Sequence, residues 1–142
     1  MTNITATVSK EFNAPKSTVW DALIDPEKVK QYLFGTNLIC DWKVGSPILF
    51  KGEWEGKPYE DKGIILRFEH AQIIQYSYWS GFSGLVDSPE NYQVITYSLL
   101  EREGKTKLSL TQENCATEET KAHSEKNWEM VFGLMKQMVE KG

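Results

Sequence analysis

The stretch FNAPKSTVWDALIDPEKVKQYL, residues 12–33, decides the fold because it joins a strand to two short helices. Residues 4–12 alternate almost regularly between polar and apolar side chains and are rich in β-branched residues, which predicts a half-buried strand. Pro15 stops the pairing of that strand. Ser17 can then cap a helix over residues 17–24.

The dipeptide Asp25-Pro26 ends this helix, because the residue before a proline is pushed out of the helical region. Pro26 can open a second short helix over residues 26–33 at its first turn. The two helices are expected to form a wall beside the strand. Their inward-facing apolar side chains are Val19, Trp20, Leu23 and Ile24, then Val29, Tyr32 and Leu33.

Beyond this entrance the chain changes to strands rich in β-branched and aromatic residues, separated by short turns with glycine or proline. Connections of that length make neighbouring strands antiparallel, which predicts a meander. With the first strand, the sheet has seven strands. The six predicted here are residues 37–41, 47–54, 60–69, 72–79, 91–101 and 105–113.

After Thr117 the pattern is helical to the end of the chain, with no proline. At about 1.5 Å per residue this helix is ~30 Å long and can cross a small sheet. Its apolar side chains form one stripe that must face the sheet. They are Trp128, Val131, Phe132, Met135, Met138 and Val139.

This topology predicts a hollow. A twisted antiparallel sheet of this size curls, and one helix about 10 Å wide cannot fill its concave side. The gap must hold either large side chains or a bound molecule. The aromatic rings of the chain suit a pocket for a mostly apolar ligand, and the alternative is that they form plain core. The predicted ligand-binding residues are Trp54, Arg67, Tyr76, Tyr78, Trp128 and Phe132.

Two features qualify this site. Arg67 lies in an apolar run in which alternation can turn it inward to anchor a ligand carboxylate, although an arginine in such a place more often points outward. Residues 81–91 form a longer connection with apolar Phe82, Leu85 and Val86, which either covers the pocket or packs back onto its own sheet.

Composition excludes several other functions. The 142 residues carry 20 acidic and 16 basic side chains, and the bases are scattered, so the net charge of −4 disfavours nucleic acid as a partner. No apolar run is long enough to span a membrane and no secretory signal is present, so we expect a cytoplasmic protein. The sequence predicts that Cys40 and Cys115 are small buried hydrophobic residues, and it does not exclude a disulfide between them.

No catalytic or metal motif is complete. His70 and His123 lack a second ligand at metal spacing, and no phosphate loop is present, so neither a metal nor another cofactor is predicted. Gly81-Phe82-Ser83-Gly84-Leu85 fails the nucleophile-elbow pattern. Glu53 and Glu55 share a predicted strand face, but no partner orients them as a base.

Four stretches resemble one superfamily over nearly the whole chain: FNAPKSTVWDALIDPEKVKQYL, DWKVGSPILF, KGIILRFEHAQIIQYSYW and NWEMVFGLMKQMVE. They are similar to SRPBCC or START-like proteins, and most like stand-alone bacterial proteins related to the C-terminal domain of the activator of the heat-shock-protein-90 ATPase. The resemblance implies an α+β helix-grip fold, in which a curved seven-stranded antiparallel sheet grips a long C-terminal helix over a ligand cavity.

The resemblance and the residues together favour one domain over residues 1–142 that binds a small apolar molecule without catalysis, as a monomer or homodimer. The first alternative is a co-chaperone-like module whose partner is a chaperone. The second is a cyclase or hydrolase on the same fold, which requires Glu53, Arg67 and Tyr76 to converge in the pocket.

Overall fold

The computed structural model describes residues 2–141, with the side chain of Trp54 excepted. The elements follow the predicted order, and the α+β fold is confirmed. They are β1 (Ala6–Phe12), α1 (Lys16–Ile24), α2 (Pro26–Tyr32), β2 (Asn37–Ile39), β3 (Pro47–Trp54), β4 (Lys57–Glu69), β5 (Ile73–Tyr78), β6 (Gln93–Arg102), β7 (Lys105–Glu113) and α3 (Glu118–Lys141), with short 3₁₀ turns η1 (Gly81–Ser83) and η2 (Pro89–Asn91) between β5 and β6.

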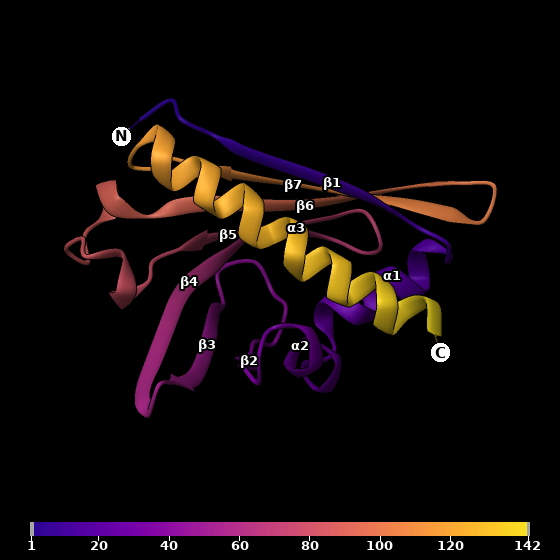
Figure 1. Ribbon diagram of the computed structural model, residues 1–142, viewed down its shortest axis with the longest axis horizontal. Coiled ribbons are helices and arrows are strands. Elements are labelled where there is room, and N and C mark those ends of the chain that lie inside the picture. Colours follow the sequence, from indigo (N-terminus) through magenta and orange to yellow (C-terminus); the bar gives the residue numbers. More distant parts are fainter. Residues whose placement is uncertain (1, 142) are drawn as a thin grey trace.

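The strands form one seven-stranded antiparallel sheet in the order β1-β7-β6-β5-β4-β3-β2. Strands β2 to β7 are therefore the predicted meander, and β1 joins it at β7. Figure 1 shows that β3 and β4 run steeply across the direction of β6 and β7, so the sheet is bent. The short helices α1 and α2 lie near one end of the sheet, as expected from the entrance sequence.

The entrance differs from the prediction at its first cap. Helix α1 begins at Lys16 with Pro15 in the capping position, and no side chain caps it. Ser17 lies inside the helix, so the prediction that it caps the helix is wrong. The extended backbone of Pro15 lets its carbonyl accept from the N–H groups of Thr18 and Val19, which starts the helix one residue earlier. Asp25 ends α1 and caps α2 by accepting from the Glu27 N–H at 3.0 Å.

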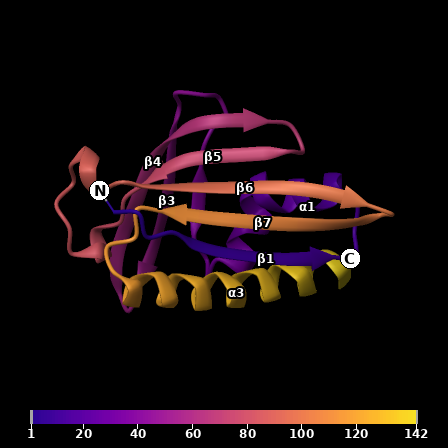
Figure 2. The ribbon, with the colours of Figure 1, turned by 90° about the horizontal axis from the view of Figure 1, so that it is seen from above.

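Helix α3 runs alongside the edge strand β1 (Figure 2). The Glu125 carboxylate accepts from the Thr7 N–H at 2.9 Å, and the Glu140 carboxylate accepts from the Asn13 N–H at 2.9 Å. The Lys136 ammonium donates to the Glu11 carbonyl at 2.8 Å. These bonds cover the free edge of the sheet, which would otherwise present unpaired backbone groups. They also fix α3 toward one side of the curved sheet.

The core occupies only one half of the space under α3. The buried side chains of α3 are Val131, Phe132 and Met135, all in its C-terminal half. That half passes over α1 (Figure 1), whose Val19 and Trp20 are also buried. The N-terminal half of α3 faces the sheet across open space, described below. Both cysteines are free thiols, with Cys40 half-buried and Cys115 buried.

Candidate ligand-binding cavity

A cavity of about 760 Å³ lies between the N-terminal half of α3 and the concave side of the sheet. Thr120, Ser124 and Trp128 line it from α3 at four-residue spacing, so they share one helical face. The other walls come from β3 to β7, from the segment after α2 and from the loop that joins β5 to β6. The volume is in the range of small-molecule sites, about 300 to 1,000 Å³.

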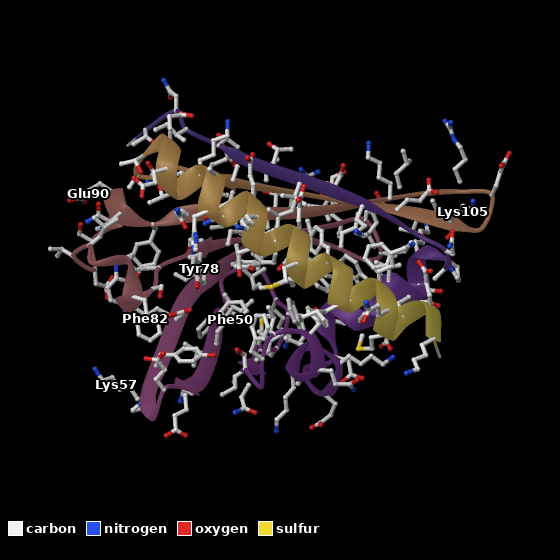
Figure 3. The ribbon with its side chains drawn as sticks, in the orientation of Figure 1. Phe50, Lys57, Tyr78, Phe82, Glu90 and Lys105 are labelled. Atoms are coloured by element: carbon white, nitrogen blue, oxygen red, sulfur yellow. The ribbon has the colours of Figure 1, made fainter. Side chains whose placement is uncertain are left out.

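A continuous row of aromatic rings borders the cavity. The ring of Phe50 lies 5.7 Å from Tyr76 and 5.9 Å from Tyr78, measured between centroids. Tyr76 lies 6.0 Å from Tyr97, and Tyr97 meets Trp128 edge-on at 6.0 Å. Tilted and edge-to-face arrangements at these distances are the favoured ones for aromatic pairs. In Figure 3, Phe50 and Tyr78 lie close together between α3 and the strands beneath it.

The polar tips of these rings are bonded to each other or to polar side chains in the wall. The Tyr76 and Tyr97 hydroxyls lie 3.3 Å apart, and the Tyr78 hydroxyl donates to Asp61 Oδ2 at 2.6 Å. Trp128 Nε1 donates to Gln112 Oε1 at 2.8 Å, and Gln112 Nε2 donates in turn to Gln93 Oε1 at 2.7 Å. The wall is thus apolar in area but carries fixed hydrogen-bonding groups.

Burial raises the pKa of the tyrosines that face this region. The pKa of Tyr76 lies well above the usual tyrosine value because the ring is buried and other tyrosine hydroxyls are close. For Tyr78 the causes are burial and then the negative charge of Asp61. Burial raises the pKa of Tyr97 to about 12. All three hydroxyls are therefore protonated at neutral pH; Tyr78 donates to Asp61, and one of the Tyr76 and Tyr97 hydroxyls donates to the other.

These pKa values predict a loss of stability in alkali. Above pH ~10 the unfolded chain releases the Tyr97 proton while the folded chain keeps it, so the free energy of unfolding falls as pH rises. A folded pKa of about 12 corresponds to a total loss of about 2.7 kcal/mol from Tyr97 alone, of which about 1.9 kcal/mol is lost between pH 9 and pH 11.5. Urea unfolding at pH 9 and pH 11.5 measures this loss. Tyr97→Phe should show a smaller drop, and an equal drop would contradict the assignment.

Three of the six predicted binding residues line the cavity: Tyr76, Tyr78 and Trp128. Phe132 does not. Its ring is buried in the core and packs against Trp128 at 5.7 Å between centroids, so it supports the wall from behind. Trp54 belongs to β3 by its backbone, and its side chain lies outside the described part of the structure.

Arg67, predicted among the ligand-binding residues, does not line the cavity, and of the two orientations that the sequence left open its side chain takes the outward one. Its side chain is exposed and pairs with Glu69. A bulge shifts the register of β4 against β5 between Ile65 and Arg67, so Leu66 and Arg67 are both exposed in succession. Strict alternation from Asp61 and Ile65 would have placed Arg67 inside, and the extra residue of the bulge reverses this.

Several lining residues were not predicted. Asp61 points inward from β4 and is paired in register with Phe50 of β3. Gln93 and Gln112 complete the polar part of the wall on β6 and β7. The signal for Asp61 was its alternation with the buried Ile65, four residues along the same strand.

The loop between β5 and β6 forms a wall at the mouth of the cavity. Phe82 and Leu85 line the cavity, and the Phe82 ring packs against Tyr59 at 5.7 Å between centroids. Trp79 Nε1 donates to the Leu85 carbonyl at 3.2 Å. Asp87 holds the base of the loop by pairing with Lys62 at 2.6 Å. The apolar residues at 81–91 thus contribute both to the cavity and to the loop's own packing.

The three residues required for an enzyme do not converge. Glu53 and Tyr76 line the cavity, but Arg67 lies outside it. Glu55 belongs to the turn after β3 with a left-handed φ of 51°, and so does not share a strand face with Glu53. Within residues 2–141 no group of three or more metal-binding side chains is found, and no helix is long and apolar enough to cross a membrane.

An antiparallel sheet that grips a long C-terminal helix over an aromatic cavity defines the class of helix-grip, START-like proteins. Within that class, residues 13–140 match the family described as Activator of Hsp90 ATPase homolog 1-like protein. The chain belongs to this family.

Solved structures agree with this assignment. The chain is 46% identical to ChR145 from Cytophaga hutchinsonii, with a TM-score of 0.85 and coverage of 97% of this chain and 94% of that chain. MLL2253 from Mesorhizobium loti is 18% identical, with a TM-score of 0.79 and coverage of 97% and 98%. CalU16 from Micromonospora echinospora, also 18% identical, has a TM-score of 0.75 and coverage of 95% and 75%. The last two show the fold alone. The comparison with curated proteins found no match.

Proposed function

We propose that this protein binds one small, mostly apolar molecule in the cavity between α3 and the sheet, without catalysis. The observation that carries the proposal is the hollow itself, about 760 Å³ beside a row of aromatic rings. The protein's own side chains fill the C-terminal half of the space under α3 and leave the N-terminal half open. An apolar ligand would bury the ring faces that border this space.

The mouth of the cavity supports the same proposal. Phe34, Phe82 and Met130 line it, and they are 56%, 61% and 51% exposed. They come from three separate elements: the segment after α2, the β5–β6 loop and α3. Exposed apolar side chains that gather around one opening are typical of a binding site. A ligand that enters there gains further apolar contact at the rim.

A blocked cavity tests the proposal. Ser124→Trp places a large ring in the cavity from α3, while Lys126→Trp places the same ring on an exposed position of the same helix outside it. With the neutral probe Nile red, we expect blue-shifted fluorescence at one site per chain for the unaltered protein. Ser124→Trp should weaken this binding by at least about tenfold, or about 1.4 kcal/mol. Lys126→Trp should leave it unchanged. Refusal of the probe by the unaltered protein, or equal binding by both variants, would refute the proposal.

A chaperone partner is the second candidate, and family membership is what favours it. The exposed Ile64 and Leu66 of β4 offer apolar surface outside the cavity. A pull-down with the chaperone and an assay of its ATPase rate decide between the two functions. An unchanged ATPase rate would end this candidate, and it leaves the cavity proposal standing.

A further inference from the structure

One carboxylate in the cavity wall lacks a partner. Asp61 is only 9% exposed, and its Oδ2 accepts from the Tyr78 hydroxyl at 2.6 Å. Its Oδ1 is buried and has no hydrogen-bond donor within residues 2–141. A carboxylate can accept about four hydrogen bonds, and a buried carboxylate oxygen that has no donor lowers the stability of the fold. The aspartate can therefore accept at least one more hydrogen bond.

No lysine or arginine in the described part of the cavity wall compensates Asp61. The charged or titratable side chains that line the cavity in the described structure are Glu53, Asp61 and His123 besides the tyrosines, and none is a lysine or arginine. The neighbouring Lys62 pairs with Asp87 at 2.6 Å, at the base of the β5–β6 loop. The electrostatic sign of the cavity is thus negative, because burial strengthens the field of Asp61 and no cation screens it.

The surroundings of Asp61 suit a cation rather than a neutral donor. Phe50 lies opposite Asp61 in the register of β3 and β4, and its ring neighbours those of Tyr76 and Tyr78. The faces of such rings attract cations. The last torsion of an aspartate side chain has a broad energy minimum, so a small rotation brings the covered oxygen toward the cavity. A ligand ammonium could then bond the carboxylate while its apolar body lies along the rings.

We propose that Asp61 anchors the positively charged ammonium group of an otherwise apolar ligand, and that the cavity discriminates against anions. This inference rests on the proposed function, because it assumes that the cavity takes an apolar molecule. It adds the chemical class of that molecule, an amphiphilic amine. A carboxylate of the same shape would face the unscreened charge of Asp61 and be repelled.

Three probes of nearly equal shape test the inference on the unaltered protein at pH 7: 1-naphthylmethylamine, which is cationic, 1-naphthylmethanol, which is neutral, and 1-naphthoate, which is anionic. Isothermal titration calorimetry gives the affinity of each. The expected order is amine, alcohol, carboxylate, with about tenfold between amine and alcohol because a charge-assisted hydrogen bond replaces a neutral one. Equal affinities for the three probes, or a preference for the carboxylate, would overturn the inference without using any variant.

The variant Asp61→Asn removes the charge and keeps the size and an acceptor for Tyr78. It should lower amine affinity by about tenfold and leave alcohol affinity within about twofold. Glu60→Gln is the matched control, since Glu60 precedes Asp61 on β4 but is exposed and does not line the cavity, and it should change amine affinity by less than about threefold. An amine preference that survives Asp61→Asn overturns this inference but leaves the proposed function standing. Failure of all three probes, together with refusal of Nile red, overturns the proposed function as well.

Discussion

Gly63→Ala is expected to lower the free energy of unfolding by about 3 kcal/mol or more. A Cβ at position 63 would lie 1.6 Å from the backbone carbonyl oxygen of Ser77 on β5. No rotation of a side chain relieves a clash with backbone, so β4 and β5 would have to separate. Beside this contact, Lys62 and Trp79 exchange two backbone hydrogen bonds of 3.0 and 2.8 Å, which separation would break.

The damage should also reach the cavity, because β5 carries Tyr76 and Tyr78 and β4 carries Asp61. We expect Gly63→Ala to lose Nile red binding in the fraction that remains folded. Gly133→Ala is the matched control, since a Cβ there meets nothing within 4 Å and the residue lies inside α3. It should stabilise the protein by about 0.5–1 kcal/mol through helix propensity. Urea unfolding measures both, and equal stability of the two variants would contradict the close contact at Gly63.

The pairing of β4 with β5 illustrates what sequence patterns could and could not predict. Proline, aspartate and glycine act locally, so the break at Asp25-Pro26 and the antiparallel turns followed from the residues alone. A bulge depends on how two strands meet in space. Its position between Ile65 and Arg67 left no mark in the alternation of β4, and the sequence therefore could not decide on which side of the sheet Arg67 lies.

The candidate site was predictable from the sequence to a similar extent. Aromatic content and sheet curvature predicted a cavity with Tyr76, Tyr78 and Trp128 in its wall. Alternation predicts that Glu60 and Asp61 face opposite sides, but it does not say which one turns inward. That depends on Ile65, which is fully buried and fixes the inner face of the strand. Asp61 could therefore be recognised only once the inner face of β4 was known.

The apolar stripe of α3 shows the same limit of sequence prediction. The variant Phe132→Ala tests whether position 132 belongs to the core. Helical periodicity put Trp128 and Phe132 on one face, but only the tertiary structure decides which meets the core and which meets the cavity. Phe132 is 1% exposed. Its truncation should cost about 3–5 kcal/mol in the free energy of unfolding, because the core left behind cannot fully collapse.

Met130→Ala is the control on the same helix. Met130 is 51% exposed at the mouth of the cavity, so its truncation should change stability by less than about 0.5 kcal/mol while weakening Nile red binding. The two variants should thus separate stability from binding: position 132 supports the fold, and position 130 contacts the ligand. Urea unfolding and probe titration on both variants measure this. If Met130→Ala destabilised the protein as much as Phe132→Ala, the placement of position 130 at the cavity mouth and of position 132 in the core would be wrong, since a half-exposed side chain has fewer packed neighbours to lose.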